Sequence, residues 1–76
     1  MELNEFTQKV RDQFLEIDQP HVTTEVEFRT LETWDSLTGM AVLTMIEDEY
    51  KVIIPVDDFK QLKTVVELFN FVKSNN

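Results

Sequence analysis

The sequence has no cysteine, one glycine, two prolines and one histidine among its 76 residues. Without cysteine, disulfide bonds, thiolate metal sites and a cysteine nucleophile are excluded. A single glycine excludes a flexible glycine-rich linker and a glycine-rich phosphate-binding loop. The longest uninterrupted apolar run, residues 40–43, is far shorter than the roughly 20 residues that cross a bilayer. We therefore expect one folded domain, residues 1–76, with no membrane insertion.

Few residues could carry catalysis or hold a metal ion. The only histidine, His21, lies beside Pro20, and nothing in the pattern marks a partner base for it. The pair Asp57-Asp58 lacks the alternating oxygen ligands and the glycine of an EF-hand loop. We expect no catalytic residue, no metal site and no enzyme activity.

The charge is strongly acidic, with a formal net charge of −8. Arg29 is the only lysine or arginine in residues 21–50. Four of the five lysines lie in residues 51–76. Such a field repels nucleic acid and anionic lipid and favours basic protein partners, although acidity also keeps a small protein soluble. The first residues lack the basic and apolar regions of a secretory signal, so a cytoplasmic location is expected. A small acidic protein of this kind is also expected to be a monomer.

The apolar pattern predicts an all-α fold of three longer helices and one short helix. Apolar residues recur every three or four positions from Leu3 to about Ile17, which predicts the first amphipathic helix. Residues 18–35 lack this period and are predicted to form a long ordered loop, packed on the core by Phe28 and Leu31.

The remaining helices are predicted from capping residues. Asp35 is a good N-cap for a second helix from Ser36 to about Lys51. Asp57 or Asp58 is predicted to cap a short third helix that reaches Leu62. The spacing of Thr64 and Glu67 is that of a capping box, which predicts a fourth helix with four residues inward: Val65, Leu68, Phe69 and Val72.

The candidate site is the tripeptide Asp35-Ser36-Leu37. It falls where the long loop meets a predicted helix start, so the Ser36 hydroxyl should lie at the surface. A phosphate esterified to that hydroxyl would lie beside free backbone N–H groups and the positive end of the helix dipole. Asp and Ser are also favoured at helix starts for purely structural reasons, so the tripeptide alone is only moderately specific.

The surrounding sequence resembles the acyl carrier protein family from Phe28 nearly to the C-terminus. Phe28 and Leu31 precede the tripeptide at the family's spacing, and the tripeptide matches the family's phosphopantetheine attachment motif. Further matches follow in register: Glu47-Asp48-Glu49-Tyr50, Ile54-Pro55, Leu62 and Thr64-Val65. The resemblance implies a four-helix carrier domain that bears a covalent 4′-phosphopantetheine arm on Ser36, with Asp35 and Leu37 beside it.

In this family a phosphopantetheinyl transferase moves the arm from coenzyme A to the serine, and the arm's thiol carries an acyl thioester. The resemblance therefore implies a transferase and acyl-loading and acyl-processing enzymes as partners, and fatty acid or related lipid metabolism as the setting. An aminoacyl or peptidyl carrier would share the serine, the arm and the four helices. A helical interaction module without an arm is the alternative from another class.

The predicted second helix carries more apolar residues than core packing needs, among them Met45. The family uses this helix for partner docking, which implies that Leu37, Met40, Ala41, Glu47 and Asp48 contact partners. Thr38 and Ala41 stand where the family has acidic docking residues, which suggests a specialised carrier with its own partners, in a specialised lipid or polyketide-type pathway. An acyl chain could also be shielded against Ile54, Phe59 and Leu62, although these are equally well ordinary core residues.

Overall fold

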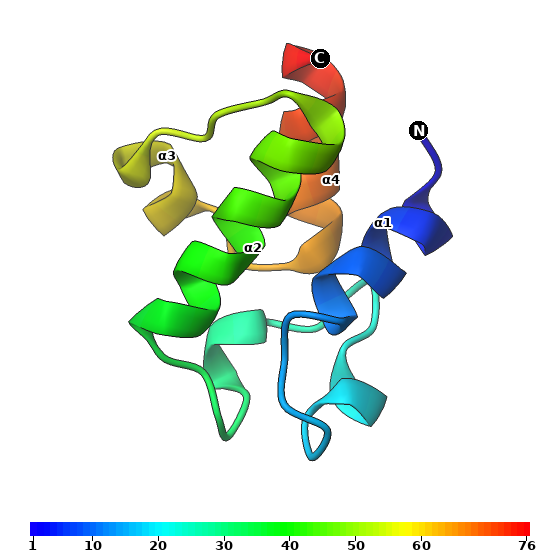
Figure 1. Ribbon diagram of the computed structural model, residues 1–76, viewed down its shortest axis with the longest axis vertical. Coiled ribbons are helices and arrows are strands. Elements are labelled where there is room, and N and C mark those ends of the chain that lie inside the picture. Colours follow the sequence, from blue (N-terminus) through cyan, green and yellow to red (C-terminus); the bar gives the residue numbers. More distant parts are fainter.

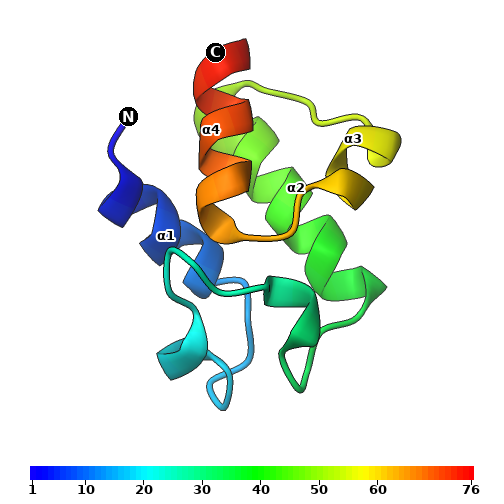
Figure 2. The same ribbon diagram turned by 180° about the vertical axis from the view of Figure 1, so that it is seen from behind.

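The computed structural model describes residues 1–76 and is all-helical, as predicted. Its longest helix, α2, lies between α1 and α3, while α4 packs behind it (Figures 1 and 2). The helices are α1 (Leu3–Arg11), α2 (Ser36–Tyr50), α3 (Val56–Gln61) and α4 (Val65–Asn75), with short 3-10 turns at Gln19–His21 and Phe28–Thr30. The only β-type pairing is an isolated bridge between Glu27 and Thr64, which joins the long loop to the start of α4.

The core is one cluster of 15 buried hydrophobic side chains drawn from all four helices and the loops. Helix α1 packs against both α2 and α4. The Phe6 ring lies 5.6 Å from the rings of Tyr50 and Phe69, measured between centroids. As predicted, Phe28 is buried and Leu31 packs partly against the cluster, so the long loop is part of the core. No helix has both the length and the apolar character needed to span a bilayer.

Helix α1 is shorter than the prediction of a helix to about Ile17. It ends at Arg11, and the chain continues with tighter bonds from Gln13 N to Val10 O and from Phe14 N to Arg11 O. The Arg11 guanidinium donates to Val22 O at 2.6 Å, which joins the helix end to the loop. Phe14 is still buried, but Ile17 is 60% exposed, so its predicted place on the inward face is wrong.

Helices α2 and α4 begin where their capping residues predicted. The Asp35 side chain accepts a hydrogen bond from Thr38 N, and Thr64 and Glu67 form a complete capping box. Helix α2 ends at Tyr50, one residue before the predicted end, because Lys51 adopts the left-handed conformation with φ 59°. The four residues predicted to face inward from α4 are all buried.

The prediction that Asp57 or Asp58 caps α3 is wrong. The N-cap is Pro55, and both aspartates lie in the first turn, where they complement the helix dipole without a capping bond. The C-terminal end is held from outside the helix. Arg29 donates to Phe59 O at 2.6 Å and to Leu62 O at 2.5 Å, so a loop residue adds two side-chain hydrogen bonds to carbonyls at the end of this helix.

Candidate functional site

Ser36 is the first residue of α2 and is exposed. The neighbouring cap is well made: Asp35 Oδ1 accepts from Thr38 N at 2.8 Å and from Thr38 Oγ1 at 3.0 Å. These bonds, first the one from the Thr38 backbone, lower the pKa of Asp35 below its ordinary value. None of the capping bonds uses the Ser36 hydroxyl, so that hydroxyl is held at the surface and is available for esterification.

The segment that leads into Ser36 is fixed by a buried carboxylate. Asp18, in the loop after α1, is 3% exposed and accepts from Thr33 N at 2.8 Å and from the Thr33 hydroxyl. These bonds, above all the one from the hydroxyl, lower the pKa of Asp18 below its ordinary value. The chain three residues before Ser36 is thereby joined to the loop after α1.

Trp34 forms the second support of this segment. Its ring lies between those of Phe14, Phe28 and Phe59, with centroid distances of 6.0, 5.3 and 6.4 Å. Gly39, one turn into α2, is buried against it, and a Cβ there would lie 3.1 Å from Trp34 Cη2. The glycine therefore lets the indole approach the helix, which explains a residue that ordinarily weakens helices.

A groove of about 340 Å³ runs beside Ser36 between α2 and α3. Its lining is mostly apolar, with two basic side chains: Arg29, Trp34, Ser36, Gly39, Met40, Leu43, Val56, Phe59 and Lys60. Of the three residues proposed to shield an acyl chain, Phe59 lines this groove, Ile54 lines a separate hollow on α2, and Leu62 lines neither. Shielding of a cargo by this trio remains a prediction, and only Phe59 is placed at the groove.

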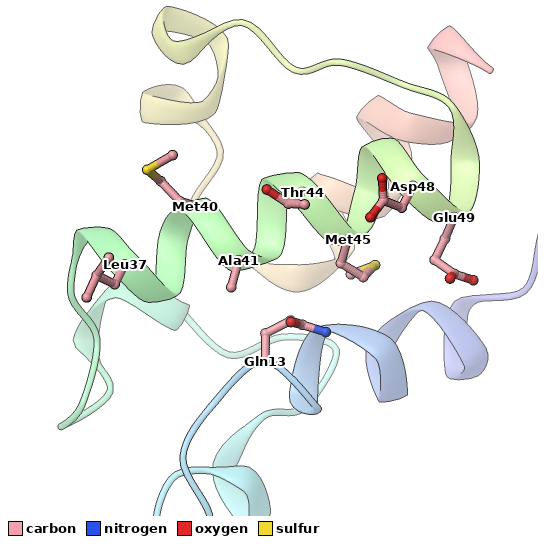
Figure 3. A pocket seen from close by; sticks show the side chains of 8 residues that line it. All are labelled: Gln13, Leu37, Met40, Ala41, Thr44, Met45, Asp48 and Glu49. Carbon is pink, nitrogen blue, oxygen red and sulfur yellow. The ribbon is translucent and has the colours of Figure 1, made fainter.

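A second hollow, of about 530 Å³, lies on the α1 side of α2 (Figure 3). Leu37, Met40, Ala41, Met45 and Asp48 contribute to it from α2, and Gln13 reaches toward it from the turn after α1. Leu37 is 76% exposed and Met40 64%, so both are accessible to a partner, and Ala41 is half-buried. The prediction that Met45 widens the exposed apolar surface is wrong, because Met45 is only 8% exposed and belongs to the core.

The three acidic residues at the end of α2 differ in their contacts. Glu47 and Asp48 are exposed and make no salt bridge, so their charges face solvent. Glu49 instead pairs with Lys9 of α1, whose Nζ also bonds Glu5, at 2.9 and 3.3 Å. The pKa of Lys9 is raised by these bonds, first by the one to Glu49. Two of the three acids are therefore available to basic partners, and the third joins α2 to α1.

Comparison with known protein families matches this arrangement to one of them. The family described as "phosphopantetheine attachment site" matches residues 8–72, which includes the whole of α2 and α3. The chain belongs to this family. No solved structure matches the chain at a significant level. The family's prosthetic group is a covalently attached 4′-phosphopantetheine, so the chain is a phosphopantetheine carrier.

The residues of this carrier fit that prosthetic group. The group needs an accessible hydroxyl to form its phosphodiester, and Ser36 offers one at the first turn of a 15-residue helix. The helix dipole there favours a phosphate. Carrier domains of this family generally interact with phosphopantetheinyl transferases and acyl-processing enzymes.

The sequence pattern did not reveal three contributors to the site. Asp18, Trp34 and Arg29 are isolated in the sequence, and each acts through contacts with distant segments. The glycine at position 39, unusual inside a helix, was the one available signal that a large side chain approaches α2 there.

Proposed function

We propose that this carrier is an acyl carrier protein, which holds acyl intermediates as thioesters on a 4′-phosphopantetheine arm attached to Ser36. The proposal is carried by the exposed Ser36 hydroxyl at the capped start of α2, in a chain whose family bears this arm. The chain supplies no catalyst in this proposal. The reactive thiol arrives with the arm, which agrees with a sequence free of cysteine.

The residues next to Ser36 have supporting roles. Asp35 keeps the first turn of α2 in one geometry, so that a transferase meets a preformed serine. Asp18 and Trp34 hold the preceding segment from the other side. An ordered acceptor reduces the conformational entropy that the transferase must otherwise overcome on binding.

The partner surface is the exposed side of α2. Leu37, Met40 and Ala41 offer apolar contacts near Ser36, and Glu47 and Asp48 offer charge at the far end. A flexible methionine suits partners of different shapes. Basic partner enzymes would dock through the acids and reach the arm over the apolar residues.

This uneven distribution of charge supports a specialised lipid or polyketide-type pathway. Thr38 and Ala41 leave the Ser36 end of α2 without acidic side chains, so docking there depends less on charge. Standard fatty acid synthesis enzymes should therefore turn over the loaded protein more slowly than their own carrier. Equal turnover would contradict the specialised role.

The primary test is the intact mass after incubation with coenzyme A and a broad-specificity phosphopantetheinyl transferase. The wild-type protein should gain one phosphopantetheine group. Ser36→Ala should gain none, and Ser74→Ala is the matched control because Ser36 and Ser74 are the only serines in the chain. Loading of Ser36→Ala, or no loading of any form, would contradict the attachment site.

The cargo is tested separately on the loaded protein. Adenylating enzymes supplied with fatty acids should charge the arm, whereas those supplied with amino acids should not. Charging only with amino acids would identify an aminoacyl or peptidyl carrier and overturn the acyl part of the proposal.

A further inference from the structure

The groove beside Ser36 has a basic edge in an otherwise acidic protein. Arg29 and Lys60 both line it, although the chain has a formal net charge of −8 and Arg29 is the only base in residues 21–50. Neither side chain forms a salt bridge, since the only ion pairs in the structure are those of Lys9. Two cations without carboxylate partners therefore lie at the groove.

Arg29 is held rigidly in this position. Its guanidinium bonds two carbonyls at the end of α3 and lies 4.8 Å from the ring centroid of Phe59 and 4.9 Å from that of Phe28. Burial lowers the pKa of Arg29, but an arginine in a protein stays charged. The two carbonyl bonds use two of its five N–H donors, which leaves donors for a further acceptor.

A polar hollow of about 200 Å³ adjoins the groove and shares both cations with it. Its lining has no apolar residue and adds Lys63, Thr30 and one carboxylate, Glu27. An anionic group at this place meets three cations and one acid. Positive charge therefore dominates where the apolar floor of the groove ends.

We propose that the α2–α3 groove binds an anionic group delivered on the prosthetic arm, with Arg29 and Lys60 as its ligands. This inference rests on the proposed function, because the arm on Ser36 brings the group to the groove. Two groups on the arm are anionic and can be this ligand: the phosphate of the arm itself, and a carboxylate at the free end of an acyl cargo. The apolar floor, with Trp34, Met40 and Phe59, would contact the neutral part of either.

The test compares two cargoes on the phosphopantetheine form, adipyl and hexanoyl, which have the same chain length and differ by a terminal carboxylate. Each is loaded on the wild-type protein, on Lys60→Gln and on Lys73→Gln. Lys73 is the matched control because it is an exposed lysine of α4 that lines neither the groove nor the polar hollow. Arg29 is not replaced, because it also holds the end of α3.

Two readouts are measured on each form: the rate of thioester cleavage by hydroxylamine, and the NMR shift of Arg29 Nε–H. If the cargo carboxylate is the ligand, adipyl cleavage should be about two- to fivefold slower in wild type than in Lys60→Gln, as for an exposed charge pair. Hexanoyl cleavage should not change, and 1 M salt should remove the difference because the Debye length falls to about 3 Å.

The phosphate source gives a different result. The Arg29 signal should then shift on loading of the bare arm, in wild type and Lys73→Gln but less in Lys60→Gln, with both cargoes alike. Absence of both effects, or equal effects of Lys60→Gln and Lys73→Gln, would overturn the proposal. Loading is verified by mass beforehand, so failure of the groove proposal is distinguishable from failure of attachment at Ser36.

Discussion

Replacement of Gly39 by alanine sets two effects of opposite sign against each other. Alanine is favoured over glycine inside a helix by about 1 kcal/mol. In this protein, however, the new Cβ would lie 3.1 and 3.2 Å from Trp34 Cη2 and Cζ2, and 3.7 Å from Phe59 Cε2. The first two distances are shorter than ordinary contacts, so either the indole or the helix must move.

The surroundings of Trp34 decide which effect is larger. The indole is confined by three other aromatic rings, so it cannot turn away as a flexible chain end would. Overpacking of such a site costs about 1–3 kcal/mol. With the helix gain subtracted, Gly39→Ala should lower the free energy of unfolding by about 1 kcal/mol.

A double-mutant cycle with Trp34→Leu isolates the contact. In the leucine background the clash is relieved, and the same Gly39→Ala change should raise the free energy of unfolding by about 1 kcal/mol. The coupling between the two positions is then about 2 kcal/mol. All four proteins are measured by urea unfolding, followed by circular dichroism because the variant lacks the only tryptophan.

The result that refutes this reasoning is simple to recognise. If Gly39→Ala stabilises the wild-type protein by the full helix gain, the Trp34 contact does not limit the side chain at position 39. The same conclusion would follow if the effect of Gly39→Ala had the same sign and size in both backgrounds.

The remaining predictions concern caps and pH. Thr64→Ala removes the capping box of α4 and should lower the free energy of unfolding by about 1 kcal/mol in urea, with no change in the rate of phosphopantetheine loading. Asp35→Ala removes the cap beside Ser36 and should slow loading as well, because the first turn of α2 frays; equal loading rates of the two variants would contradict this role. The pKa of Asp18 is lowered from its ordinary value of about 3.8, chiefly by the hydrogen bond from the Thr33 hydroxyl. The ionised carboxylate therefore stabilises the folded state fully above the unfolded-state pKa, and this stabilisation is lost as the pH falls through the folded-state pKa. The stability difference between wild type and Asp18→Asn, measured in urea, should be constant above about pH 5 and shrink below about pH 4, and a difference unchanged down to about pH 3 would argue against the carboxylate as the acceptor.

Much of the helical pattern was predictable because its causes are local. The caps at Asp35 and Thr64 act through hydrogen bonds that span three residues, so both residues of each bond are visible in one short stretch. The inward face of α4 follows from the helical period in the same way.

The errors lie where distant contacts compete with local pattern. The apolar period favours a first helix to Ile17, but the bond from Arg11 to Val22, eleven residues away, joins the helix end to the loop instead. Helix α3 takes Pro55 as its N-cap although two aspartates follow, and its other end is completed by Arg29, about thirty residues away. No window of a few residues contains these partners.

The sequence by itself determined that the chain is all-helical, that helices begin at Ser36 and Val65, and that Asp35-Ser36-Leu37 lies at a helix start. Each depends on period and capping, which act within about one helical turn. Only the tertiary structure decided that Trp34 lies against Gly39 and that Arg29 and Lys60 lie at the groove beside Ser36. Those placements result from packing between segments far apart in the chain, where the burial of aromatic rings outweighs the preferences of single residues.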